Sequence, residues 1–126
     1  MTLCLVREVL VDLKLGHYTN DGIEVIDVAG EIDVATAPQL RALLIDLTSK
    51  NSCQLVVNLA KVEFLDSSGV GVLVGAAKRV RARDGSLDLV CTQARILKVF
   101  KITGLTKVFA IHQTVDQAIA AMTAGK

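Results

Sequence analysis

The sequence is poor in aromatic residues and carries almost no net charge. Its 126 residues include no tryptophan, one tyrosine and three phenylalanines, and 14 basic side chains nearly balance 13 acidic ones, giving a net charge of +1. Single-stranded nucleic acids are bound by aromatic stacking in basic grooves, and anionic membranes attract an excess of positive charge. The composition therefore argues against both ligands and favours a protein partner.

Long hydrophobic runs are also absent. The longest, such as residues 70–77, fall far short of the about 18 apolar residues that span a bilayer, and residues 1–8 lack the basic start and cleavage site of a signal peptide. The chain is nevertheless 52% hydrophobic, which is ample for one core. We predict a single cytoplasmic domain over residues 1–126, in which residues 1–8 form a mobile extension or an edge strand.

Cysteine and histidine patterns that signal disulfides or metal sites are missing. Cys4, Cys53 and Cys91 are odd in number and widely spaced, and neither His17 nor His112 has a partner at ligand spacing. We therefore expect no metal, no cofactor and no disulfide framework. Cys91, in an apolar strand-like segment, is predicted to be a core thiol and Cys4 the more reactive one, and both histidines are interpreted as surface or turn residues.

The periodicity of the apolar residues predicts strands that alternate with helices. Apolar and other residues alternate over residues 9–16, and a second strand-like segment, residues 23–28, follows the turn-like residues 19–22, which predicts a starting hairpin. The nearly continuous apolar run at 55–59 is typical of a central strand covered on both faces. The remaining predicted strands are residues 87–91 and 108–111.

Helix-start signals predict four helices. Thr36 and Gln39 have capping-box spacing, with a leucine stripe at positions 40, 43, 44 and 47, and Thr114 and Gln117 repeat the box before the last helix. Of the other two predicted helices, one begins at Ser67 and is closed by Gly85. The second spans residues 93–102. The order β-β-α-β-α-β-α-β-α predicts an α/β fold with a mixed, largely parallel sheet and about four helices.

The residues from Asp66 to Gly69 predict a turn from a strand into a capped helix start. Asp or Ser can cap the free N–H groups of a helix start, and a glycine allows another backbone to come close. A serine at that helix edge can be reached from the solvent. Asp33 lies in a loop that the fold should bring near the Ser67 turn, and its residues alone indicate a solvated loop. Gly69 and Gly71 are not followed by Gly-Lys-Ser/Thr, so a nucleotide-binding P-loop is unsupported.

The basic run at residues 78–83 ends the predicted helix that starts at Ser67. Its four cations have no interleaved aromatic residues, so we interpret it as a solvated helix end that suits the helix dipole. It could still contribute contacts to a protein partner.

Four segments form recognisable motifs: residues 30–33 (GEID), 57–59 (VNL), 64–73 (FLDSSGVGVL) and 102–105 (ITGL). Together they resemble the bacterial anti-sigma factor antagonists, which carry a STAS domain. The resemblance spans nearly the whole chain. The order and spacing of these segments match those of the family as well. Residues 78–82, 85–87, 95–98 and 103–109 are similar to the actinobacterial BldG-type antagonists in particular.

The resemblance implies a STAS-like fold and a partner switch that is not an enzyme. In that family the unphosphorylated antagonist binds an anti-sigma factor that is also a serine kinase, and so releases a sigma factor for transcription. Phosphorylation ends the binding, and a PP2C-type phosphatase restores it. The family's acceptor directly follows the aspartate, which here makes it Ser67, with Ser68 as the second choice. The implied partner-binding residues are Asp33, Asp66, Ser67, Ser68 and Gly69. The alternative is a STAS module that senses a nucleotide or another small ligand within a larger signalling complex.

Overall fold

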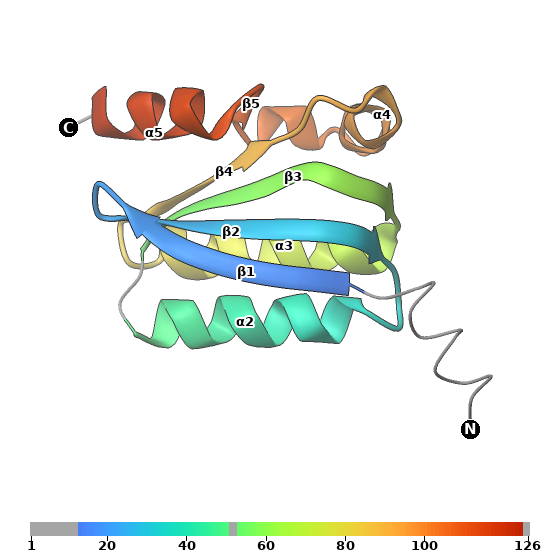
Figure 1. Cartoon of the computed structure of the whole chain (residues 1–126), viewed down its shortest axis with the longest axis horizontal. Helices are drawn as coiled ribbons and strands as arrows, with labels where there is room; N and C mark the ends of the chain where they lie inside the picture. Colours follow the sequence, from blue (N-terminus) through green and yellow to red (C-terminus); the bar gives the residue numbers. More distant parts are fainter. Residues whose placement is uncertain (1–12, 51–52, 125–126) are drawn as a thin grey trace.

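A five-stranded mixed sheet forms the centre of the protein (Figure 1). The computed structural model describes residues 13–50 and 53–124. The strands are β1 (Leu13–Asn20), β2 (Ile23–Ile32), β3 (Gln54–Leu65), β4 (Ser86–Val90) and β5 (Ile111–His112), in that spatial order. The helices are α2 (Ala37–Ser49), α3 (Ser67–Arg81), α4 (Ala94–Ile102) and α5 (Val115–Ala124), with a 3-10 turn η1 at Leu105–Lys107. The predicted α/β fold is confirmed, with the predicted element order.

The hairpin of β1 and β2 is tighter than the sequence suggested. Asn20 pairs directly with Ile23, so the turn has only two residues, Asp21 and Gly22, with φ of 54° and 77°. Two positive φ values in succession are what a two-residue hairpin turn requires. Residues 19 and 20, predicted to lie in the turn, therefore belong to β1. Residues 9–12 of the predicted strand, like residues 1–8, lie outside the described residues.

Strands β2 and β3 both run further than their apolar cores. They pair in parallel as far as Glu31 with Phe64 and Ile32 with Leu65, although the predicted strands ended at residues 28 and 59. The extra residues are polar or exposed on one face, which hides them from a search for continuous apolar runs, but backbone pairing does not depend on that pattern. As a result, both strands end side by side at one edge of the sheet.

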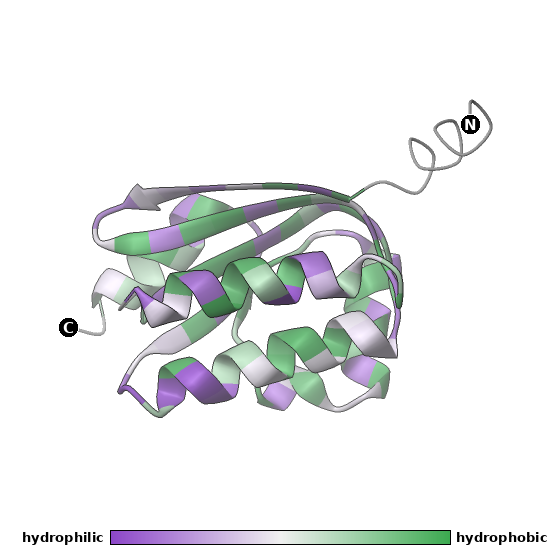
Figure 2. Ribbon diagram, turned by 90° about the horizontal axis from the view of Figure 1, so that it is seen from below, coloured by the Kyte–Doolittle hydropathy of each residue, from purple (hydrophilic) through white to green (hydrophobic). Residues whose placement is uncertain are grey.

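Two hydrophobic cores hold the helices on the sheet. Helices α2 and α3 lie side by side on one face (Figure 2), and their buried leucines pack against the inward residues of β2 and β3. This larger core includes Ile26, Leu40, Leu44, Leu59 and Leu73, none of which is exposed. On the other face, α5 packs Ala118, Ile119 and Met122 against Val25, Val56 and Val90. None of the helices in the described part of the chain is long and apolar enough to cross a membrane.

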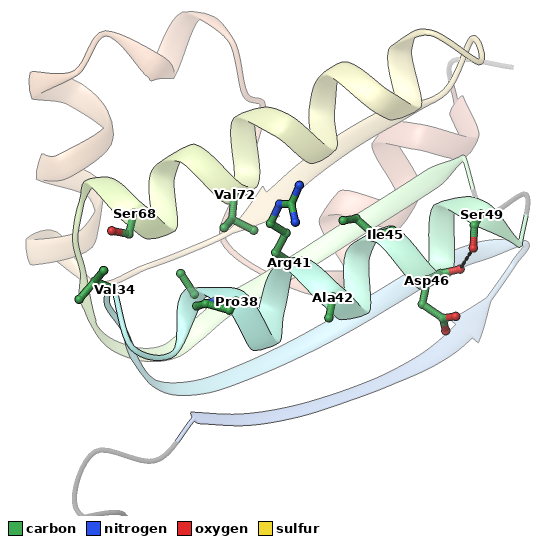
Figure 3. A pocket seen from close by; sticks show the side chains of 10 residues that line it. Val34, Pro38, Arg41, Ala42, Ile45, Asp46, Ser49, Ser68 and Val72 are labelled. Carbon is green, nitrogen blue, oxygen red and sulfur yellow. Dashed lines mark hydrogen bonds between the residues drawn. The ribbon is translucent and has the colours of Figure 1, made fainter.

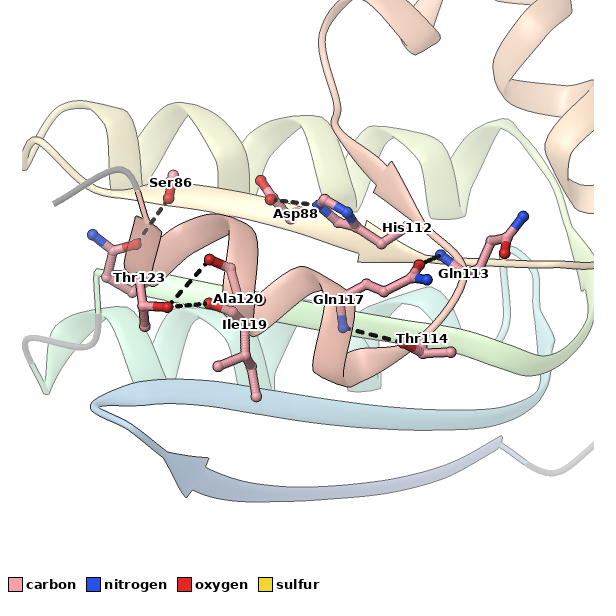
Figure 4. Close-up of polar contacts among 10 residues, drawn as sticks. Ser86, Asp88, His112, Gln113, Thr114, Gln117, Ile119, Ala120 and Thr123 are labelled. Carbon is pink, nitrogen blue, oxygen red and sulfur yellow. Dashed lines mark hydrogen bonds and ion pairs between the residues drawn. The ribbon is translucent and has the colours of Figure 1, made fainter.

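The capping-box prediction is wrong at the first helix and largely right at the last. Thr36 precedes α2 but makes no side-chain cap, because its hydroxyl donates to the Glu31 carbonyl oxygen instead. At α5, the Gln117 N–H donates to Thr114 Oγ1 at 3.1 Å (Figure 4). The Gln117 side chain accepts from the Gln113 N–H, one residue before the position that the motif predicts.

The last strand is shorter than predicted and shifted. The structure has only Ile111–His112 in β5, and Val108 is an exposed residue after η1. Phe109 is buried because its ring packs edge-on against Phe100, with centroids 6.1 Å apart. Burial in the core, and not strand pairing, therefore explains the apolar character of this segment.

Candidate functional site: the turn between β3 and α3

The turn that begins α3 lies where β2 and β3 end together. The N–H of Asp66 donates to the carbonyl oxygen of Ile32 at 3.2 Å, which joins the two strand ends. The loop from β2 to α2 starts one residue later, at Asp33. The carboxyl edge of parallel strands is where open α/β sheets usually present their functional residues. The structure thus brings Asp33 and the Asp66 turn together, as the sequence predicted.

The helix cap is made by Asp66, which resolves the ambiguity between aspartate and serine. Asp66 Oδ1 accepts from the N–H groups of Ser68 and Gly69, at 2.9 and 3.2 Å. Ser67 is the first residue of α3 and is exposed, whereas Ser68 is half-buried. Within the described part of the chain, neither serine hydroxyl makes a hydrogen bond. The Ser67 hydroxyl is therefore not needed for the cap and is open to chemistry.

Gly69 serves the site through packing. It is buried, and a Cβ at this position would overlap the side chains of Leu65 and Ile32. The absence of a side chain lets the first turn of α3 lie directly against the ends of β3 and β2. A direct contact of Gly69 with a partner is therefore not supported by its place in the fold, although it fixes where Ser67 lies.

Asp33 holds the loop between β2 and α2. Its Oδ1 accepts from the N–H groups of Ala35 and Thr36, at 2.9 and 3.0 Å, and its own N–H donates to Thr36 Oγ1 at 2.9 Å. These bonds form a compact aspartate turn that replaces the predicted capping box. The loop so fixed presents Val34, which is 75% exposed.

Two exposed apolar residues, Val34 after the end of β2 and Phe64 near the end of β3, lie at the strand ends next to the turn, and we call them the apolar rim. Phe64 is 44% exposed and lies on β3, two residues before Asp66. Exposed large apolar side chains beside a functional turn are typical of a protein-binding surface. Sequence reasoning did not assign these two residues to the site, although Phe64 opens the motif that contains Ser67.

A groove continues from the turn between α2 and α3 (Figure 3). The cavity has a volume of about 650 Å³, with Ser68 and Val34 at one end and Ser49 at the other. Its walls are mainly apolar, and Arg41 projects into it from α2. The groove was not predicted, because it depends on how two helices pack and no local motif encodes that.

The basic end of α3 is only partly solvated, which corrects the prediction from sequence. Arg81 Nη2 donates to the Val108 carbonyl oxygen at 2.7 Å, and Arg83 Nη1 donates to that of Thr48. Arg79 is half-buried, and its Nε and Nη2 atoms have no hydrogen-bond partner among the described residues. The other three cations of the run, Lys78, Arg81 and Arg83, are exposed, as predicted.

The histidines and cysteines take up ordinary structural positions. His17 Nδ1 contacts Glu24 Oε2 at 2.6 Å, and His112 Nε2 contacts Asp88 Oδ2 at 2.9 Å (Figure 4). His17 is exposed as predicted, but His112 lies in β5 with most of its side chain buried. Cys91 is buried, as predicted, and burial raises the pKa of its thiol.

Of the two remaining cysteines, one lies in the described part of the chain, where no cluster of metal ligands is found. Cys4 lies outside the described residues, and Cys53 is half-buried. In residues 13–50 and 53–124, no three His, Cys, Asp or Glu side chains gather as a metal site would require.

These features define a small α/β domain that presents a serine at the carboxyl edge of its sheet. Residues 16–118 match the STAS domain model. The chain is 32% identical over 103 residues to an anti-sigma-B factor antagonist of Staphylococcus epidermidis, covering 82% of this chain and 95% of that protein. The chain belongs to the STAS domain family, and the resemblance predicted from its motifs is confirmed.

Two solved structures extend this comparison. An anti-sigma factor antagonist from Mycobacterium paratuberculosis superposes with a TM-score of 0.84 at 28% identity, covering 89% of this chain and 95% of the other. The Bacillus cell fate determinant SpoIIAA, in its phosphorylated form, superposes with a TM-score of 0.68 at 26% identity, covering 87% and 98%. The fold is thus one that accepts a phosphoryl group in a related protein.

Proposed function

We propose that this protein is an anti-sigma factor antagonist whose binding is switched off by phosphorylation of Ser67. In the unphosphorylated form it binds an anti-sigma factor that is also an ATP-dependent serine kinase, and so releases a sigma factor in the cytoplasm. A PP2C-type phosphatase restores the active form. The observation that carries this proposal is the exposed Ser67 hydroxyl, which makes no hydrogen bond with the described residues and lies where β2 and β3 end together.

The neighbours of Ser67 explain how a phosphate there would weaken binding. Two N–H groups of the first turn of α3, those of Ser68 and Gly69, already donate to Asp66. The added charge of about −1.5 to −2 would lie next to the Asp66 carboxylate and would lose its water in an interface with the apolar rim. A penalty of about 3 kcal/mol lowers affinity more than a hundredfold. No refolding of the domain is required.

The acceptor assignment is tested by phosphorylation in vitro. Wild type, Ser67→Ala and Ser68→Ala are incubated with ATP and each purified anti-sigma factor kinase of the source organism, and intact masses are compared. We expect wild type and Ser68→Ala to gain one phosphoryl group and Ser67→Ala to gain none, because Ser68 is half-buried. A full gain of mass in Ser67→Ala would assign the phosphate to another residue.

The switch itself is tested by affinity for the same kinase without ATP. Ser67→Asp and Ser67→Glu should bind about a hundredfold more weakly than wild type, whereas Ser67→Ala should bind as wild type does. Ala120→Asp is the matched control, because it adds the same charge on the exposed side of α5, on the opposite face of the sheet. Equal affinity of all four variants would contradict a charge-operated switch at Ser67.

A further inference from the structure

The groove between α2 and α3 contains positive charge that the protein itself does not neutralise. Arg41 and Arg79 make no ion pair with any described residue. The acid that lines the groove is Asp46, and Lys50 Nζ already contacts its Oδ2 at 3.2 Å. Arg41 therefore faces a largely apolar groove without a counter-charge from the described residues, and a second unpaired guanidinium, that of Arg79, lies on the neighbouring helix.

Arg79 does not line the groove itself, but it lies on the same face of α3 as two residues that do. Ser68, Val72, Gly75 and Arg79 lie at i, i+4, i+7 and i+11, which is one face of the helix, and the first two of these line the groove. The Arg79 side chain folds back over Gly75, where Nη1 is 3.6 Å from the position of a Cβ. The glycine thus leaves room for a guanidinium to lie against the helix.

The two arginines lie near enough to affect each other. Burial lowers the pKa of Arg79, and the charge of Arg41 on the facing helix lowers it further. Nε and Nη2 of Arg79 are buried without a partner, although a guanidinium has five donors arranged to bind a carboxylate in two places. Arg41 projects from α2 toward the same space, between Val72 and Ile45 (Figure 3).

We infer that this groove binds an acidic side chain of the anti-sigma factor, with Arg41 and Arg79 holding its carboxylate and Val72 and Ile45 contacting its apolar neighbours. This inference rests on the proposed function, since it names the chemistry of the same partner. Charge complementarity favours a carboxylate, and the groove is continuous with the Ser67 turn through Ser68 and Val34. A single partner segment can therefore contact the phosphorylation turn and the arginine pair together.

The test measures affinity for the anti-sigma factor that binds the unphosphorylated wild-type protein. Arg41→Glu should weaken binding more than about tenfold, since a reversed charge would repel the carboxylate. Arg41→Lys should lose less, because lysine keeps the charge but not the paired donors. Lys98→Glu on α4 is the matched control: it reverses an exposed charge outside the groove and should bind as wild type. Arg41 is exposed, so these changes leave the fold intact.

Two further measurements identify the occupant. Replacing the contacting acid of the partner with arginine should restore binding to Arg41→Glu. Titration of the protein alone with sodium acetate and with inorganic phosphate, followed by NMR of the arginine Nε–H signals, should show no saturation at millimolar concentrations. Saturable phosphate binding would overturn the assignment to a protein side chain in favour of a free anion.

The failure of this inference is distinguishable from that of the proposed function. If wild type binds no anti-sigma factor, the proposed function fails before the groove is tested. If wild type binds and Arg41→Glu binds equally well, the arginine pair does not contact the partner, while the switch at Ser67 stands.

Discussion

At the scale of single residues, the start of α3 depends on one side chain that is present and one that is missing. Asp66 accepts from two N–H groups of the first turn, and Gly69 lets that turn lie against Leu65 and Ile32. Neither role involves the Ser67 hydroxyl. The chemistry of the switch is thus separate from the structure that positions it.

Gly69→Ala is expected to destabilise the protein by about 1–3 kcal/mol, because its Cβ would overlap two buried side chains of the strand ends. Gly71→Ala is a matched control in the same helix, since nothing lies within 4 Å of its Cβ position. There alanine should stabilise the helix by up to about 1 kcal/mol. Urea unfolding of both variants measures the difference, and equal stabilities would contradict the close packing at Gly69.

At the scale of elements, the sequence predicted what local patterns encode. The buried faces of α2 and α5 follow from apolar spacing, and the resemblance of the motif around Ser67 identified the candidate acceptor. Strand ends were less predictable: Lys61 continues β3 by pairing with Ala29 of β2, although its side chain is exposed and charged. Phe109 gave a strand signal because it is buried against Phe100.

The features that sequence reasoning missed are those that need two elements at once. Val34 becomes a candidate contact residue because the Asp33 turn holds it at the end of the groove that also contains Ser68. Arg79 becomes one because α2 packs alongside α3. In the sequence, Arg79 is one of four cations in a basic run, which favours a solvated helix end. Only the packing shows that part of its guanidinium is buried.

At the scale of the whole molecule, the switch operates on a surface while the two cores stay unchanged. Ser67 is exposed and contributes to neither core, and the cap of α3 is made by Asp66. A charge at Ser67 gains from the helix dipole and loses from the nearby Asp66 carboxylate, so the two effects oppose each other.

The free energy of unfolding of Ser67→Asp should therefore lie within about 0.5 kcal/mol of wild type, as for other surface substitutions. Urea unfolding measures it, and amide NMR spectra should change only near residues 33–34 and 64–70. Asp66→Ala provides the contrast, because loss of the cap costs about 0.5–2 kcal/mol. Shifts spread through both cores of Ser67→Asp, or a large loss of stability, would show that the switch refolds the domain. If the core signals stay in place while the affinity for the kinase falls, the phosphate acts through local charge at the binding surface.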